Sequence, residues 1–253
     1  MSSARINRSE ARVIAEEEFR RFAGLLATLS DDEWSQPTDC TGWDVRKMAL
    51  HVLGSADAQA SVRVFVHQFR RGLPLNKQID SHHWVDGMNE LQIRERSHLS
   101  NDEIVAQLAA MGPKAVEGRW RTPLPMRYLP MPFGPPIGWV PLKYLLDVGF
   151  TRDVWAHRID ISAATGRPMQ LSADHDGRLV ADIVAEWGSI HGQPYELVLE
   201  GVAGGKFSQR VQGAGVEGAG VDGERVEIDA VDFIRTLSGR LPGQGVLAHP
   251  LPL

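Results

Sequence analysis

Residues 145–168 read LLDVGFTRDVWAHRIDISAATGRP, a pattern typical of a long helix that closes at its final Gly-Arg-Pro. Within this stretch Asp153, His157 and Asp160 stand at i, i+4 and i+7, so a helix places them in one stripe. Followed backward, the stripe continues through Leu146, which is a core-like position. A carboxylate and an imidazole that point into a core need polar partners, and a metal ion can supply them.

A second helix is predicted to start at TGWDVRKM, residues 41–48, and to run to about Arg71. We expect Thr41 or a neighbour to cap it, with Asp44 in the first turn, where an acid meets exposed amide hydrogens. His51 lies on the core-facing side of this helix, together with Met48, Ser55, Ala58 and Val62.

In a helical bundle, one histidine from one helix can meet a carboxylate–histidine pair from another. The sequence therefore predicts a metal site made of His51, Asp153 and His157. Zinc accepts these ligands and leaves a fourth position for water or substrate, and the same set also suits iron or nickel. Spacing alone leaves other interpretations open, because core histidines are often structural and an Asp-x-x-x-His pair also arises on helix surfaces.

Two neighbours are candidates for a supporting role at this site. Asp160 can accept a hydrogen bond from the second nitrogen of a ligand histidine, or it can pair with a base on the helix surface. Arg158 can bind a substrate carboxylate, although a solvated helix face is the more common place for such a residue. His82 and His83 could line a pocket, with an ordinary surface position as the alternative.

The rest of the chain divides into a helical part and a glycine-rich part. Periodic apolar residues predict a helix over residues 9–29, a further helical stretch made of 84–97 and 101–120, and a helix over 140–165. With the helix that carries His51, these suggest a four-helix bundle over residues 1–167. Residues 121–138 hold six prolines and are expected to form an ordered loop across the bundle. Residues 168–253 are expected to form a small α+β domain: a helix over 171–187, strands within 195–213 around a Gly-Gly turn, a strand over 223–230 and a helix to 240.

Composition bounds the possible functions. The apolar fraction is 43%, the charged fraction is 23% and the net charge is −5 with both signs interspersed, so neither disorder nor a nucleic-acid partner is expected. No window approaches a membrane span and the N-terminus lacks a signal-peptide core, which predicts no membrane partner and a cytoplasmic location. The single cysteine, Cys40, excludes an intrachain disulfide and is expected to be structural. The GAGVEGAG segment is expected to be a flexible turn.

Two stretches carry a resemblance to a known family. TDCTGWDVRKMALHVLGS, residues 38–55, resembles the entry to the second helix in the mycothiol-dependent maleylpyruvate isomerase family, a branch of the DinB-like metal-binding bundles. Residues 145–168 resemble the second signature of that family, a carboxylate-x-x-x-His followed by Asp and a terminal Gly-Arg-Pro. The segment ending DFIRTLSGR resembles the small α+β, sterol-carrier-like domain that follows the bundle in these proteins.

The resemblance implies a divalent metal, with zinc as the expected ion, and mycothiol as a thiol cosubstrate. It matches His51, Asp153 and His157 to the family's ligands, with Asp153 where a glutamate is usual. It implies an isomerase or S-transferase that acts on a small electrophilic substrate, in a protein expected to be a monomer or weak homodimer. The alternative is a non-catalytic, metal-containing protein with a small-molecule-binding or regulatory function. A further alternative is a purely structural bundle whose site holds no metal.

Overall fold

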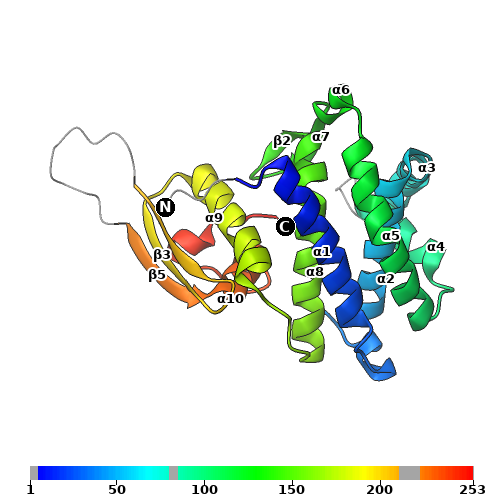
Figure 1. Ribbon diagram of the computed structural model, residues 1–253, viewed down its shortest axis with the longest axis horizontal. Helices are drawn as coiled ribbons and strands as arrows, with labels where there is room; N and C mark the ends of the chain where they lie inside the picture. The colour runs from blue at the N-terminus through cyan, green and yellow to red at the C-terminus, as the bar shows by residue number, and fades with distance from the viewer. Residues whose placement is uncertain (1–4, 80–84, 211–222, 253) are drawn as a thin grey trace. The chain divides into compact units, whose positions relative to one another are not determined.

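The computed structural model describes residues 5–79, 85–210 and 223–252 (Figure 1). The chain is mostly helical, with two small sheets. By contacts it forms two compact units: unit 1 comprises residues 1–10, 128–152 and 170–253, and unit 2 comprises residues 11–127 and 153–169. The boundary predicted between residues 167 and 168 stays a prediction. Among the described residues, no helix combines the length and the apolar character needed to cross a bilayer.

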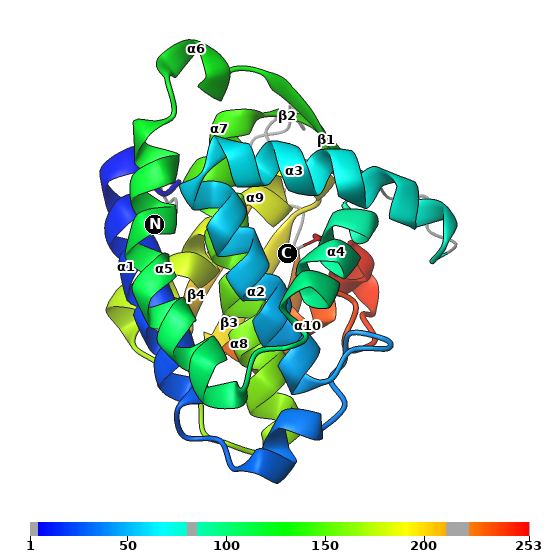
Figure 2. The same ribbon diagram turned by 90° about the vertical axis from the view of Figure 1, so that its right-hand side faces the viewer.

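Unit 2 is built from long helices around one hydrophobic core. Its helices are α1 (Arg8–Leu26), which starts in unit 1, α2 (Val45–Ala60), α3 (Val62–Gly72), α4 (Asp86–Arg96), α5 (Asn101–Arg121) and the larger part of α8 (Phe150–Thr165). Short 3-10 turns cover Asp31–Ser35 and Leu73–Lys77. Figure 2 shows α1, α2 and α5 side by side, and their apolar faces share the core with Val154 and Ile161 of α8. This core holds the helices that carry the predicted ligands.

The second predicted helix is two helices. Asp44, and not Thr41, is the N-cap of α2, because its carboxylate accepts a hydrogen bond from the Lys47 amide at 2.7 Å. The prediction of one helix to Arg71 is wrong, since Ser61 has an extended backbone with φ of −144° and separates α2 from α3. The Ser61 hydroxyl accepts from the Val64 amide and so caps α3.

The expectation of a loop over the proline-rich residues 121–138 is wrong for most of that stretch. It contains the short helix α6 (Leu124–Arg127) and a hairpin of β1 (Pro130–Gly134) and β2 (Gly138–Pro141). Both strands of a two-stranded hairpin are edges, and Pro130 and Pro132 stand two apart, so both missing donors face the same side. The helix predicted from Val140 begins instead at Leu142, with α7 (Leu142–Tyr144) and a π turn over Leu145–Gly149 leading into α8.

The C-terminal part of unit 1 matches the predicted order of elements. A π turn over Ala173–Gly177 leads into α9 (Arg178–His191), followed by β3 (Tyr195–Glu200), β4 (Gly205–Gln209), β5 (Glu224–Asp229), α10 (Ala230–Leu237) and a 3-10 turn over Gly245–Ala248. The strand order is β4-β3-β5, with β3 antiparallel to β4 and parallel to β5. The two strands predicted around the Gly-Gly turn are therefore confirmed, whereas the GAGVEGAG segment lies outside the described residues.

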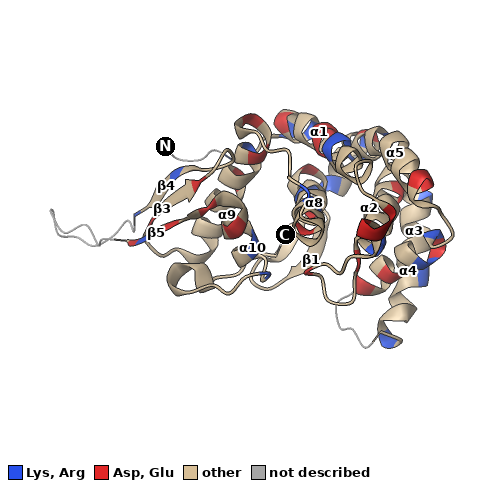
Figure 3. Cartoon of the chain, turned by 90° about the horizontal axis from the view of Figure 1, so that it is seen from below, with Lys and Arg blue, Asp and Glu red and all other residues tan. Residues whose placement is uncertain are grey.

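Unit 1 also contains a buried ion cluster that the sequence did not reveal. Arg152, at the start of α8, pairs with Asp182 and Glu186 of α9, and all three side chains are buried. Arg5 adds a second guanidinium to the same two carboxylates, at 3.1 Å from each. Residues of both charge signs occur along one helix, as Figure 3 shows for α1. This distribution agrees with the interspersed charge of the sequence.

Candidate metal centre

Helices α2 and α8 bring the three predicted ligands together. His51 comes from α2, and Asp153 and His157 come from successive turns of α8. The His51 Nε2 lies 3.5 Å from Asp153 Oδ2, and the His157 Nε2 lies 3.4 Å from Asp153 Oδ1. One potential ligand atom from each residue lies within 4.8 Å of the other two. Asp153 is one methylene shorter than the glutamate of the family pattern, and its two oxygens still reach both histidines.

Burial within this cluster is uneven. His51 is 5% exposed and His157 is 7% exposed, so both imidazoles lie in the interior of unit 2. The side chain of Asp153 is 30% exposed, so it is the most accessible of the three. Two buried histidines thus flank a carboxylate that is partly exposed.

The Nδ1 atom of each histidine faces a hydrogen-bond acceptor. The His51 Nδ1 lies 2.8 Å from Gln92 Oε1, and the His157 Nδ1 lies 3.4 Å from Asp160 Oδ2. A histidine whose Nδ1–H donates to an oxygen keeps the lone pair on Nε2, which is the arrangement typical of metal-ligating histidines. Both Nε2 atoms face the Asp153 carboxylate, so the described side chains converge on a point that favours a cation.

Electrostatics agree with this geometry. Burial by itself raises the pKa of the Asp153 carboxyl, but charge attraction and hydrogen bonds from His157 and His51 outweigh it and hold that pKa below its usual range. Burial lowers the pKa of His157, but the charge of Asp153 and the hydrogen bonds that the ring makes to Asp153, Asp160 and Cys40 raise it well above its ordinary value. The site therefore keeps a carboxylate anion ready for either a proton on His157 or a metal ion.

The interatomic distances suit a metal ion. A tetrahedral zinc site with bonds of about 2.1 Å separates its ligand atoms by about 3.4 Å. Each nitrogen–oxygen pair by itself has a separation close to that edge, with the His51 Nε2 3.5 Å from Oδ2 of Asp153 and the His157 Nε2 3.4 Å from Oδ1. Two imidazoles and one carboxylate are also a donor set that zinc accepts. The residues present therefore fit the ion that the sequence led us to expect.

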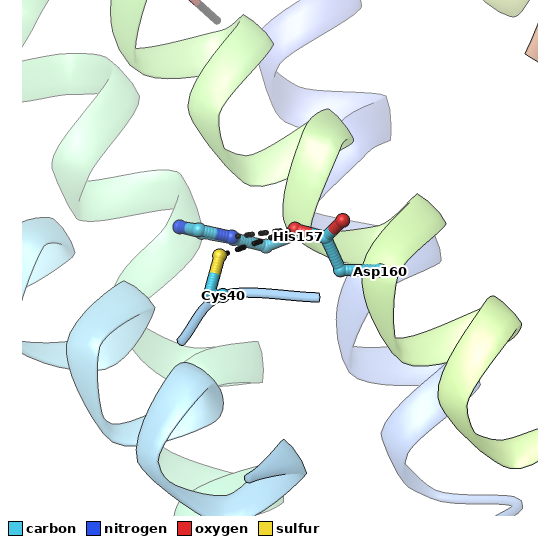
Figure 4. Close-up of side chains that lie close together, drawn as sticks. All are labelled: Cys40, His157 and Asp160. Carbon is cyan, nitrogen blue, oxygen red and sulfur yellow. Dashed lines mark hydrogen bonds and ion pairs between the residues drawn. The ribbon is translucent and has the colours of Figure 1, made fainter. Parts of the chain in front are cut away.

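A second group of potential ligands shares His157. Figure 4 shows Cys40, His157 and Asp160, whose ligand atoms lie within 4.8 Å of one another. The Cys40 Sγ lies 3.6 Å from Asp160 Oδ2, the same oxygen that faces the His157 Nδ1. Asp160 is 1% exposed, and Cys40 is half-buried. The sequence led to the expectation of a structural cysteine and gave no sign that Cys40 would lie beside a candidate ligand histidine.

Trp43 covers the histidines. Its ring centroid lies 5.1 Å from that of His51 and 6.0 Å from that of His157. The turn before α2 fixes this ring, because the Trp43 amide donates to the Cys40 carbonyl and the Thr38 amide donates to the Trp43 carbonyl. The indole therefore packs against both imidazoles and covers part of their surface.

The other candidates fall outside the cluster. Arg158 is 1% exposed, so the expectation of a solvated helix face is wrong. Its guanidinium forms a bidentate pair with Glu18 of α1, with Nε–Oε1 and Nη2–Oε2 distances of 2.7 and 3.0 Å. That pairing ties α8 to α1 and gives the guanidinium of Arg158 a buried carboxylate partner. His82 and His83 lie outside the described residues.

Comparisons with known proteins agree with this architecture. The family model described as "Mycothiol maleylpyruvate isomerase N-terminal domain" matches residues 15–162. A crystal structure of the mycothiol-dependent maleylpyruvate isomerase is similar with a TM-score of 0.56 and 16% identity, over 93% of this chain and 90% of that chain. A histidine-to-alanine mutant of that isomerase gives a TM-score of 0.55 and 15% identity over the same shares.

At these identities the structural likeness establishes the fold alone. No curated protein matches the chain in sequence. The family model covers more than half of the 253 residues and includes all three converging side chains. The chain therefore belongs to the family of the mycothiol maleylpyruvate isomerase N-terminal domain.

Proposed function

We propose that this protein is a metal-dependent and mycothiol-dependent isomerase or S-transferase that acts on a small electrophilic substrate. One observation carries the proposal: the Nε2 atoms of His51 and His157 converge on Asp153, while both Nδ1 atoms are held by acceptors. Zinc is the ion proposed for this set. Membership of the family supports mycothiol as the thiol and an isomerase-like reaction.

Each group has a distinct task in this proposal. When bound, a divalent metal lowers the pKa of a coordinated thiol and so supplies a thiolate. His51 and His157 hold their Nε2 lone pairs toward the site, Asp153 offsets part of the charge, and Asp160 orients His157. In this proposal a small molecule reaches the site at the partly exposed Asp153, and the Trp43 ring packs against both histidines.

The reaction itself requires an activated double bond. The thiolate sulfur adds to a carbon of a C=C bond conjugated to a carbonyl, and the electron pair of that bond moves toward the carbonyl. The remaining single bond can rotate, and elimination of the thiolate restores the double bond in the other geometry. An isomerase thus returns the thiol, whereas an S-transferase keeps the new C–S bond and adds a proton to the neighbouring carbon.

The finer description of the fold belongs to the same proposal. We assign residues 1–167 to a DinB-like four-helix bundle and residues 168–253 to a small sterol-carrier-like α+β domain. The shared core of α1, α2, α5 and α8 supports the first assignment. The order of strands and helices after residue 168 supports the second. A monomer or weak homodimer remains the proposed assembly.

Elemental analysis of the purified protein tests the proposed ligands. We expect about one metal ion per chain, lost in both His51→Ala and Asp153→Ala, because a three-residue site does not retain its ion without one ligand. Cys40→Ser is the matched control, since it alters the neighbouring group and leaves the proposed ligands intact. Loss of metal in Cys40→Ser with retention in His51→Ala would instead assign the ion to Cys40, His157 and Asp160.

Thiol binding tests the second half of the proposal. Calorimetric titration of mycothiol into the metal-loaded protein should show binding, which Asp153→Ala should abolish together with the metal. The same titration with the metal-free protein is the control, because the thiol is expected to depend on the ion. Absence of any affinity of the loaded protein for mycothiol would sink the thiol-dependent function and leave the non-catalytic alternative.

A further inference from the structure

A chain of three buried hydrogen bonds leads from His51 back to the helix that carries it. The His51 Nδ1 lies 2.8 Å from Gln92 Oε1 of α4. The Gln92 Nε2 then donates to Gln68 Oε1 of α3 at 2.8 Å, and the Gln68 Nε2 donates to the Gly54 carbonyl of α2 at 2.8 Å. Both glutamine side chains are buried. Three helices therefore contribute to the surroundings of one imidazole nitrogen.

The last member of the chain sets the direction of every bond in it. The Gly54 carbonyl can only accept, so the group that faces it must be the NH₂ of Gln68. The amide oxygen of Gln68 then faces Gln92, which must present its own NH₂. The remaining oxygen of Gln92 faces His51, so the proton between them belongs to the His51 Nδ1.

The backbone around this chain is adapted to it. A Cβ atom at Gly54 would lie 2.5 Å from the Gln92 Cβ and 2.7 Å from its Cγ, so a larger residue there would displace Gln92. Glycine inside a helix costs about 1 kcal/mol relative to alanine, and the close approach of Gln92 explains why α2 tolerates it. The break at Ser61 has a related consequence, because it turns α3 so that Gln68 reaches back to Gly54.

We propose that Gln92 and Gln68 are positioning residues that fix the Nδ1–H tautomer of His51. Fixing this tautomer leaves the Nε2 lone pair of His51 directed at Asp153, where the proposed ion would bind. That this tautomer matters for metal binding rests on the proposed function. The tautomer itself follows from the hydrogen bonds alone. Gln68 acts through Gln92, and the side-chain hydrogen bonds of the two glutamines, within the part of the chain that the structure describes, go to His51, to each other and to the Gly54 carbonyl.

Nitrogen NMR of the metal-free wild-type protein is the primary test. Long-range ¹H–¹⁵N spectra distinguish the protonated from the unprotonated ring nitrogen of each neutral histidine. At a pH where the ring is neutral, we expect the proton of His51 on Nδ1 and an unprotonated Nε2. A proton on Nε2 would overturn the proposal, and this measurement needs neither a variant nor a bound ion.

Variants then test the cause. Gln92→Leu should populate the Nε2–H tautomer of His51 and weaken Zn²⁺ binding by about 10- to 100-fold, the range seen when a hydrogen-bond partner of a ligand is lost. Gln68→Leu should shift both readouts in the same direction by less, since Gln92 keeps its place but can turn its amide. Gln78→Leu, the same change at an exposed glutamine, should shift neither.

The outcomes separate this inference from the proposed function. An Nδ1–H tautomer that persists in both Gln92→Leu and Gln68→Leu would overturn the role of the two glutamines. If Gln92→Leu does not fold, Gln68→Leu and the wild-type spectrum carry the test. If the wild-type protein binds no Zn²⁺, the proposed function fails, while the NMR result still decides whether the glutamines fix the tautomer.

Discussion

Asp153 is the residue on which the charges of the site depend. Its carboxylate oxygens lie 3.5 and 3.4 Å from the Nε2 atoms of His51 and His157. The Nδ1 atom of each imidazole is hydrogen-bonded to another oxygen. Without a metal, protonated His157 is the cation that pairs with the Asp153 carboxylate. When a metal ion binds, His157 must lose that proton. Protons and metal ions therefore compete for the same place.

This competition predicts a pH dependence with opposite signs in the two states. Although burial opposes it, the charge of Asp153 raises the pKa of His157 above its ordinary value of 6.5. Between the two values the folded state binds more protons than the unfolded state, so the unfolding free energy of metal-free protein should fall as pH rises. Zn²⁺ should reverse the trend, because deprotonated ligands bind it better. Urea unfolding across a pH series measures both profiles.

Asp153→Asn is the matched variant for that experiment. It keeps the shape of the side chain and removes the charge that raises the pKa of His157. We expect the pKa of His157 to move toward the ordinary histidine range in this variant, followed by NMR, and the fall in stability at higher pH to disappear. A wild-type protein whose metal-free stability does not change through this range would contradict the ion pair.

Single residues differ in how far the sequence could identify them. His51, Asp153 and His157 were found because helical spacing and family motifs are local signals. Gln92 and Cys40 had no such signal, since each acquires its partner only when segments far apart in the chain pack together. The burial of Arg158 was missed for the same reason: Glu18, 140 residues away, supplies its carboxylate.

At the level of elements, the helices and strands were largely predictable and their interruptions were not. Apolar periodicity continues across Ser61, so nothing in the pattern separated α2 from α3. The prolines of residues 121–138 excluded a long helix, but a two-stranded hairpin accepts them because both of its strands are edges. The order β3, β4, β5 and α10 followed from alternation and from the Gly-Gly turn.

The start of α2 gives a test at this scale. Asp44→Ala removes the carboxylate that accepts from the Lys47 amide, and should lower the unfolding free energy by about 1 kcal/mol. Asp44→Asn should be close to wild type, because an asparagine oxygen caps equally well. Urea denaturation of the three proteins measures the difference. Equal losses in both variants would assign the effect to the charge at the helix N-terminus and not to the cap.

At the level of the whole molecule, the two compact units are interleaved along the chain. The chain passes between them at residues 10–11, 127–128, 152–153 and 169–170, and two of these points fall inside the continuous helices α1 and α8. A sequence pattern registers a helix as one element, so it could not show that Arg152 and Asp153 belong to different units. All three proposed ligands lie in unit 2.

Because the ligands lie in one unit, removal of the metal should destabilise that unit selectively. An ion at 100 times its dissociation constant stabilises the state that binds it by about 2.7 kcal/mol. Hydrogen exchange after chelation should therefore accelerate at the α2 amides and at those of Asp153–Thr165, while β3 and β5 of unit 1 serve as the internal control. His51→Ala should exchange at the chelated rate whether or not Zn²⁺ is added. Equal acceleration of exchange in both units would show that the ion stabilises the molecule as a single cooperative body. Unchanged exchange in both units would show that the ion does not stabilise the fold.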